Sequence, residues 1–479
     1  MRRFWYDELF TYQMSQMPGM TGVWAALMGG ADLNPPLGYA FVKVSQLLFG
    51  NGELATRLPS LIGFFVMALC LYRFIARRSS ALLGYVAAMV PLCSGAYYLA
   101  SEARPYGLML GFAGLALVCW QEATIRSKRG WFLAGFTLSL AAALMSHCYA
   151  VLIFLPFGFA EIVRQYRERT MDWKMWAALV APMGCVAVYF PLFANLTSYT
   201  LGNYSFRVQW TAIPEVYERW LTPLLWPAAA GALLLAAPAL GKPVREEPRH
   251  SVQWHEWAIA AGFAIIPAAA VLLAKVLNSQ FYPRYGAMGV LGLSLLLGLF
   301  LRWRNTNTKA ATLVVAAFLC CYVASFGGWV YGILADAQTS ETAPLSKKER
   351  RQAIDQIRPE LPFVAASALE FLELDHYSKP EFAKRLYYLS DRDAELEYTQ
   401  SDILAGGFPV MEKWFKMRGL VVRYQSFIQK HPRFLLYGPY ACPNDWLIKK
   451  LIDDGAVVSL INDAPSMYGD NLLFEVTIR

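Results

Sequence analysis

Three arginines stand at the ends of long apolar runs, where they could bind a phosphate group. Arg57 precedes Leu58-Pro59-Ser60, Arg104 lies in Glu102-Ala103-Arg104-Pro105-Tyr106, and Arg284 precedes Tyr285. A guanidinium group binds phosphate through two hydrogen bonds, and a helix start adds backbone donors and a favourable dipole. The three arginines could therefore bind the phosphate of a lipid together, or each could only anchor the end of its helix.

Carboxylates form the second set of candidates. Asp7 and Glu8 are adjacent, and on spacing alone they fit a solvated N-terminal tail. Glu102 shares a short turn with Arg104 between two uncharged runs, so the two residues either line a polar cavity or form an interfacial ion pair. The segment Asn34-Pro35-Pro36-Leu37 predicts an extended stretch that leads into a helix.

Aromatic and histidine side chains are second-rank candidates. His147 and Tyr149 interrupt an apolar stretch, where a lone histidine is more often a structural hydrogen-bonding group than a catalyst. The aromatic loop 199–220, which contains Trp210, could form a substrate wall or an interfacial belt, and the belt is the more common case.

Composition identifies the elements that must position these residues. Hydrophobic residues make up 56% of the 479 residues and charged residues only 16%, which is too few for a soluble globular chain. Ten apolar runs are long enough, or nearly so, to cross a bilayer. They lie near 58–76, 81–99, 105–122, 131–147, 149–163, 175–194, 221–240, 256–275, 285–301 and 310–334. We predict a polytopic α-helical membrane protein with about ten transmembrane helices.

Basic clusters between the runs predict the topology. Read as two helices rather than one, the stretch 131–163 places all the basic loops on one side, which the positive-inside rule assigns to the cytoplasm. The net charge of +8 then reflects topology and not nucleic-acid binding. The candidate residues share the opposite, exoplasmic face, with short interfacial helices at 22–30 and 37–50. Because an N-terminal tail with two arginines translocates poorly, we expect one further span upstream.

Residues 336–479 predict a separate soluble domain on the exoplasmic side, after a membrane domain over 1–335. Strands are expected at 363–366, 434–437 and 456–460, and helices at 381–389 and 444–453, which indicates a small α/β domain. No glycine-rich phosphate loop follows the first strand, so no nucleotide is assigned. The cysteines show neither a disulfide framework nor metal-ligand spacing, because seven of the eight lie in apolar runs.

The order of these motifs resembles that of the membrane-embedded C-type glycosyltransferases. Among these enzymes, the chain resembles the branch of the protein O-mannosyltransferases and the bacterial aminoarabinose transferase of lipid A. The resemblance covers most of residues 1–335. It implies a polyprenyl-phosphate-linked sugar donor and inverting transfer to an acceptor hydroxyl. Asp7 would be the catalytic base with Glu8 beside it, and Glu102 would orient an arginine or the acceptor.

The resemblance also implies that Arg57, Arg104 and Arg284, with Tyr285, stabilise the departing lipid phosphate. No cofactor is required by the sequence, a divalent metal is not excluded, and the expected partners are the lipid-linked donor, an unknown acceptor and membrane lipid. The expected location is the bacterial inner membrane, with a periplasmic active face and C-terminal domain. Alternatives are a transporter of a lipid or envelope precursor and a non-enzymatic envelope assembly protein. The sugar, the acceptor and the oligomeric state are not predicted.

Overall fold

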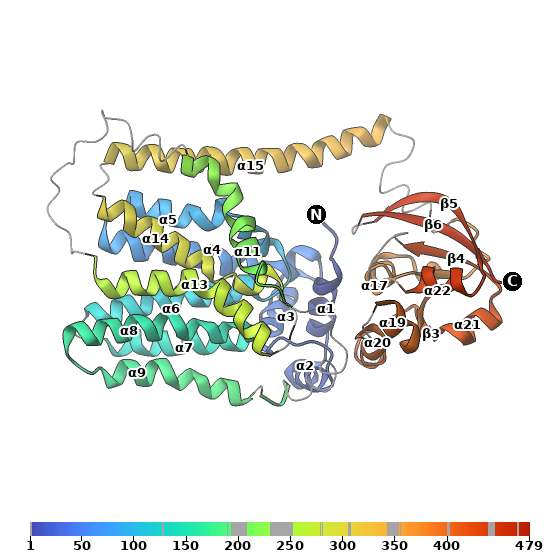
Figure 1. Ribbon diagram of the computed structural model, residues 1–479, viewed down its shortest axis with the longest axis horizontal. Helices are drawn as coiled ribbons and strands as arrows, with labels where there is room; N and C mark the ends of the chain where they lie inside the picture. Colours follow the sequence, from blue (N-terminus) through green and yellow to red (C-terminus); the bar gives the residue numbers. More distant parts are fainter. Residues whose placement is uncertain are drawn as a thin grey trace. The chain divides into compact units, whose positions relative to one another are not determined.

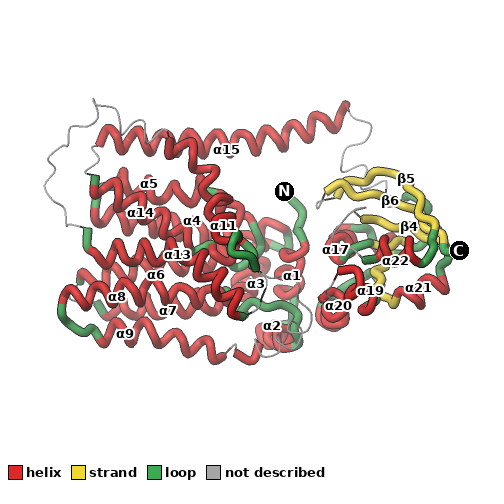
Figure 2. Tube along the Cα trace, viewed as in Figure 1, coloured by secondary structure: helices red, strands yellow, loops and turns green. Residues whose placement is uncertain are grey.

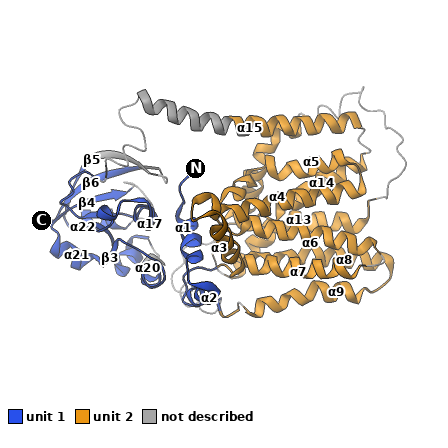
Figure 3. Cartoon of the chain, turned by 180° about the vertical axis from the view of Figure 1, so that it is seen from behind, with its two compact units in different colours: residues 1–33, 192–205, 330–479 blue, residues 34–191, 206–329 orange. Residues whose placement is uncertain are grey.

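The computed structural model describes residues 2–479 except 127–128, 189, 193–207, 230–251, 278, 280, 305–307, 343–353, 355, 400–402, 439–445 and 467–468. Two compact units make up the chain (Figure 3). The helical unit comprises Asn34–Pro191 and Phe206–Trp329, and the mixed unit comprises Met1–Leu33, Leu192–Ser205 and Val330–Arg479. This division differs from the predicted boundary at residue 335, because Met1–Leu33 packs with C-terminal residues.

The helical unit is a bundle whose long helices run side by side (Figures 1 and 2). Its first elements are α3 (Leu37–Phe49), α4 (Glu53–Arg78), α5 (Ala81–Cys93), η1 (Gly95–Ser101), α6 (Tyr106–Ile125), α7 (Gly130–Ser146), η2 (Cys148–Ile153), α8 (Phe154–Glu168) and α9 (Trp173–Val180). They are followed by η3 (Ala181–Met183), α11 (Ala212–Leu221), η4 (Thr222–Leu224), α13 (Trp254–Val276), η6 (Pro283–Gly286), α14 (Gly289–Trp303) and α15 (Thr308–Thr342), of which residues 308–329 belong to this unit.

Several of these helices suit a bilayer by length and composition. Glu53–Arg78, Tyr106–Ile125, Cys148–Glu168 and Trp254–Val276 are each long and apolar enough to cross a membrane. The pair α5 and η1 forms a fifth candidate, bent by 76°. The polytopic helical class is thus confirmed in this coarser form, while the number of ten spans stays a prediction. The predicted run 221–240 is described only as far as residue 229.

The predicted helix pair within 131–163 is confirmed. Helix α7 ends at Ser146, and His147 has an extended backbone with φ −152° and ψ 138°. The chain then re-enters helical structure through η2 and α8. The histidine that interrupts the apolar run therefore marks the turn between the two helices.

Glycines bring α4 and α6 into close contact. A Cβ atom on Gly107 would lie 2.0 Å from the Ser60 carbonyl oxygen, and one on Gly111 would lie 2.6 Å from that of Gly63. Only glycine fits at such approaches, which are typical of tightly packed membrane helices. This packing fixes the start of α6, and with it the Glu102–Arg104 turn, against α4.

Buried ion pairs join the basic ends of several helices. Arg78 at the end of α4 donates to Glu256 at the start of α13 over 2.5 Å. Arg164 contacts Glu161 over 2.7 Å, and it contacts Asp172 over 2.8 Å. Arg57 lies near the opposite end of α4 from Arg78. Within the helical unit, the basic end of α4 and the Arg57 segment thus lie at opposite ends of the bundle.

The mixed unit contains a six-stranded sheet with the strand order β3-β2-β1-β4-β6-β5. Its strands are β1 (Phe363–Ala365), β2 (Leu386–Ser390), β3 (Leu420–Arg423), β4 (Arg433–Gly438), β5 (Val457–Ser466) and β6 (Gly469–Thr477). The pairs β1–β2, β1–β4 and β2–β3 are parallel, whereas β4–β6 and β5–β6 are antiparallel. The helices are α17 (Ala368–Tyr377), α18 (Pro380–Ala383), α19 (Arg392–Thr399), α20 (Ile403–Trp414), α21 (Tyr424–Lys430) and α22 (Leu447–Asp453).

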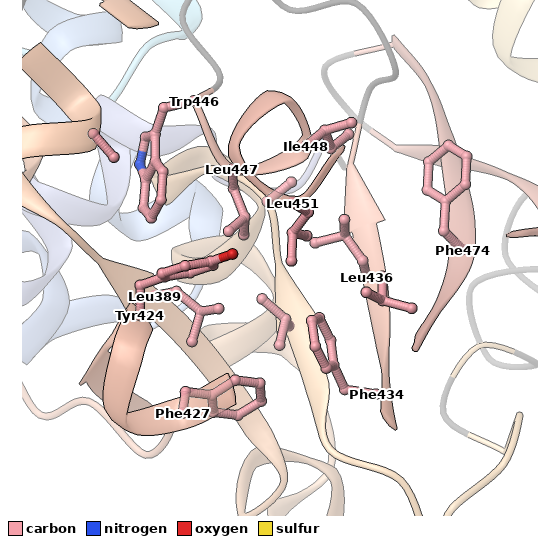
Figure 4. Close-up of a cluster of buried hydrophobic side chains, with 14 residues drawn as sticks. Leu389, Tyr424, Phe427, Phe434, Leu436, Trp446, Leu447, Ile448, Leu451 and Phe474 are labelled. Atoms are coloured by element: carbon pink, nitrogen blue, oxygen red, sulfur yellow. The ribbon is translucent and has the colours of Figure 1, made fainter. Parts of the chain in front are cut away.

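The predicted α/β character of this region is confirmed, with one element wrong. The strands expected at 363–366, 434–437 and 456–460 correspond to β1, β4 and β5, and α22 lies within the helix expected at 444–453. The helix expected at 381–389 ends early, because Leu386–Ser390 forms β2. Its two tyrosines favour a strand, and its leucines are buried in the sheet. A core of aromatic and aliphatic side chains, including Tyr424 and Trp446, covers one side of the sheet (Figure 4).

The N-terminal helices of the mixed unit are α1 (Tyr6–Ser15) and α2 (Gly19–Met28). Helix α1 packs against α17, and the backbone N–H of Phe4 donates to the Tyr377 hydroxyl over 2.7 Å. The ring of Phe10 meets that of Phe415 edge-on at 5.2 Å. The last two contacts join residues more than 370 positions apart.

Candidate active site

Four of the five sequence motifs lie at one end of the helical unit. Ser60 in α4 donates from its hydroxyl to the Leu99 carbonyl over 3.0 Å and accepts from the Gly107 N–H over 3.2 Å. A Cβ atom on Gly38 would lie 3.1 Å from Pro105. These contacts bring the Asn34–Leu37, Arg57–Ser60 and Glu102–Tyr106 segments to the same corner of the bundle.

Arg284 belongs to the same end. Its guanidinium carbon lies 4.7 Å from the ring centre of Tyr282 and 5.9 Å from that of Tyr106. Tyr106 follows Pro105 directly, so the ring of Tyr106 links the fourth motif to the corner formed by the other three. Cations attract aromatic faces in this way most strongly where water is scarce.

The second-rank residues join this cluster. The His147 ring lies 4.8 Å from that of Tyr106 and 6.0 Å from that of Tyr285. Tyr149 stacks on Tyr285, with ring centres 4.5 Å apart. The turn between α7 and η2 therefore contributes an aromatic wall beside Arg284.

Two residues of the cluster escaped the sequence analysis. Tyr98 lies in η1, where the charges of Glu102, Arg219 and Arg284 all act on its hydroxyl. The guanidinium of Arg219 lies 5.3 Å from the Tyr98 ring centre. For Arg219 the signal in the sequence is its charge within the aromatic loop 199–220, a loop whose composition is more typical of an interfacial belt. Trp210 of that loop is 60% exposed, and Lys275 lies 4.5 Å above its ring.

The cluster has a defined chemical character. Arg57 and Glu102 are almost fully buried, at 5% and 6% exposure, while Arg104 and Arg284 are half-buried. Several cations, one carboxylate and an aromatic wall at the end of an apolar bundle suit an anionic headgroup attached to a lipid chain. The aromatic faces also suit the apolar face of a sugar ring.

Asp7 and Glu8 lie in the mixed unit, and the two carboxylates differ in their surroundings. Glu8 is completely buried, and its carboxylate accepts from the backbone N–H of Trp5 over 3.2 Å and from Arg2 over 3.3 Å. It thus caps the start of α1. Asp7, in the first turn of the same helix, is partly exposed. Glu8 therefore holds the helix, and of the two carboxylates Asp7 is the more accessible to a substrate.

The part of the chain that the structure describes contains no group of side chains arranged as a metal site. Within those residues, no three histidine, cysteine, aspartate or glutamate side chains are grouped closely enough to hold an ion.

Known proteins resemble the chain in one segment by sequence and over almost its whole length by fold. Residues 33–194 match the family model described as dolichyl-phosphate-mannose-protein mannosyltransferase. None of the curated proteins is significantly similar in sequence. The fold is similar to that of ArnT from Cupriavidus metallidurans in the apo state, with a TM-score of 0.56 at 13% identity over 99% of this chain and 94% of that one.

A second ArnT structure, bound to undecaprenyl phosphate, gives a TM-score of 0.55 at 14% identity over the same shares of both chains. The family match spans three of the clustered motifs, from Asn34 to Tyr106. The predicted resemblance to membrane-embedded glycosyltransferases of the protein O-mannosyltransferase and aminoarabinose transferase type is therefore confirmed, by the family model over residues 33–194 and by the fold over nearly the whole chain.

Proposed function

We propose that this protein is an inverting glycosyltransferase that moves a sugar from a polyprenyl-phosphate donor to an acceptor hydroxyl at the exoplasmic face of a membrane. The observation that carries the proposal is the cluster of Arg284, Arg219 and Glu102 with aromatic rings at one end of an apolar helical bundle. The family match over residues 33–194 and the fold of ArnT, which binds undecaprenyl phosphate, support it.

The chemistry of such a donor explains why arginines and one base suffice. The leaving group is a lipid phosphate, which is stable as an anion and needs no proton from a general acid. Transfer then requires a carboxylate to take the proton of the acceptor hydroxyl and cations to stabilise the departing phosphate. We assign the first role to Asp7 and the second to Arg57, Arg104 and Arg284.

The aromatic wall supplies the remaining contacts in this proposal. Tyr285 and Tyr149 stack on one another and offer a flat apolar surface for the sugar ring. His147 lies between Tyr106 and Tyr285 and helps to keep both rings in place. Glu102 orients either an arginine or the acceptor. We place the active face and the C-terminal domain in the periplasm of a bacterial inner membrane.

Binding of undecaprenyl phosphate to the purified protein in nanodiscs tests the donor site. Arg284→Ala should weaken binding by roughly 10- to 150-fold, the loss expected for a charge-assisted hydrogen bond to phosphate. Arg302→Ala is the matched control, because Arg302 lies at the far end of the following helix, α14. Equal binding by Arg284→Ala and the wild-type protein would contradict the phosphate site.

A transporter is the main alternative, and one observation separates the two proposals. Transporters usually place charged groups on broken helices near the bilayer midplane. In the described residues, the candidate charges instead lie at an end of the bundle, near the start of α4, in the turn before α6, in α11 and in η6. Release of undecaprenyl phosphate from a sugar-linked donor, in detergent and without a membrane barrier, would identify transfer chemistry.

A further inference from the structure

The N-terminal acid-bearing helix and the C-terminal α/β domain form one compact unit. We propose that the C-terminal domain positions helix α1 for catalysis, with Tyr377 as the positioning residue. The inference rests on the proposed function, because it assumes that Asp7 acts as the base. It gives the C-terminal domain a role that the sequence analysis did not assign.

The backbone just before α1 is held by α17. The N–H of Phe4, a residue that is 1% exposed, donates to the Tyr377 hydroxyl over 2.7 Å. The Arg3 guanidinium lies 3.5 Å from the Glu373 carboxylate and 4.7 Å above the Tyr377 ring. The N–H and the buried ring of Phe4 and the guanidinium of Arg3 are thus all held by α17, within four residues of Asp7.

The body of the helix is held by aromatic contacts with the same domain. Tyr12 meets His376 edge-on at 4.9 Å, and Phe4 lies 6.0 Å from the same imidazole ring. Phe10 packs edge-on against Phe415, just after α20. Contacts just before α1 and at two positions along it therefore fix both its position in this unit and its rotation about its axis.

Internal capping transmits this placement to Asp7. The Glu8 carboxylate accepts from the Trp5 N–H over 3.2 Å, which closes the first turn of α1. Asp7 lies within that turn. The direction of its side chain thus follows from the orientation of the turn, which the contacts of Phe4 and Arg3 set.

Helix α1 depends on these contacts for its order. It has ten residues, and helices shorter than about 12 to 15 residues are only marginally stable alone in water. Loss of the Tyr377 hydroxyl would leave the buried Phe4 N–H without this acceptor. We expect α1 to open more often while the sheet and α17 stay folded.

Amide hydrogen exchange and steady-state kinetics on the full-length protein test the inference. Tyr377→Phe should speed exchange in residues 5–15 by roughly 2- to 10-fold, the effect of losing one intramolecular hydrogen bond. It should also lower kcat for the transfer of the sugar from an undecaprenyl-phosphate-linked donor, measured as released undecaprenyl phosphate. The KM for that donor should stay unchanged. Tyr398→Phe is the matched control, because it removes one hydroxyl bond, to Asp453, elsewhere in the same domain.

Arg3→Met provides a second variant that leaves the C-terminal domain unaltered, in case Tyr377→Phe fails to fold. It should loosen α1 in the same residues and lower kcat likewise. Unchanged exchange in α1, or faster exchange with an unchanged kcat, would overturn the inference. Failure of the wild-type protein to act on any donor would defeat the proposed function, while the exchange data alone would still decide whether the domain holds α1.

Discussion

The buried pair Arg78–Glu256 provides a sharp test of how the bundle is held. The Glu256 side chain is fully buried and that of Arg78 is 8% exposed, with 2.5 Å between Nε and Oε1. The same carboxylate accepts from Gln121 and from the backbone N–H of Gln253, each over 3.2 Å. Glu256→Gln keeps the size of the side chain and removes its charge, so the Arg78 cation stays buried without its counter-ion.

The structure sets the size of the expected effect. Breaking one partner of a buried ion pair costs about 3 to 5 kcal/mol, because a buried charge is left uncompensated. Glu168→Gln is the control, since the Glu168 side chain is 48% exposed and its partner Arg164 keeps two further carboxylates. Such an exposed pair contributes about 0 to 1 kcal/mol.

The assay is unfolding of the purified protein in detergent micelles titrated with dodecyl sulfate, followed by helical circular dichroism. The double variant Arg78→Met with Glu256→Met should recover most of the stability, since well-packed apolar side chains often replace a buried pair at little cost. A loss for Glu256→Gln no larger than that for Glu168→Gln would refute the idea that this pair locks α4 to α13.

Three further predictions follow from packing and charge. Gly111→Leu should destabilise the bundle by roughly 1 to 3 kcal/mol in the same assay, because its Cβ would lie 2.6 Å from the Gly63 carbonyl oxygen. Burial opposes ionisation of Asp172, but hydrogen bonds from Arg129 and Arg164 outweigh it and hold its pKa well below the ordinary value. The wild-type protein should therefore be more stable than Asp172→Asn above about pH 4 and lose that advantage as the pH falls further, which melting curves across pH would show. Burial raises the pKa of Glu370, so the wild-type protein should lose stability relative to Glu370→Gln as the pH rises through that pKa, which parallel melting curves would check.

Much of the helical unit could be predicted because hydrophobicity and charge repeat along the chain. The break at His147 followed from the alternation of basic loops, and the structure shows an extended residue there. The shared end of the motifs at Arg57, Glu102 and Arg284 followed from the same alternation. Local patterns of this kind are visible in sequence because each helix must satisfy the bilayer by itself.

The features of the site that could not be predicted from the sequence depend on contacts between residues that are distant in the chain. Arg219 and Tyr98 meet only because α11 packs onto η1, and neither sequence neighbourhood indicates that pairing. The contact of Phe4 with Tyr377 joins positions 373 residues apart. Glu8 is different, because it caps the start of α1 although the N-cap residue, Trp5, is not the serine or threonine of the usual capping pattern. Its capping role is therefore not visible in the sequence.

Sugar transfer by an Asp7 variant tests the central claim most directly. Purified protein would be given undecaprenyl phosphate linked in turn to labelled mannose, glucose or aminoarabinose, with an envelope extract as the source of acceptors, and released undecaprenyl phosphate would be measured. Asp7→Asn should lower the rate by about 10²- to 10⁴-fold, the usual contribution of a general base, with folding and undecaprenyl phosphate binding preserved. Asp32→Asn, in the same N-terminal segment, should keep the wild-type rate. Wild-type rates from Asp7→Asn would contradict the account.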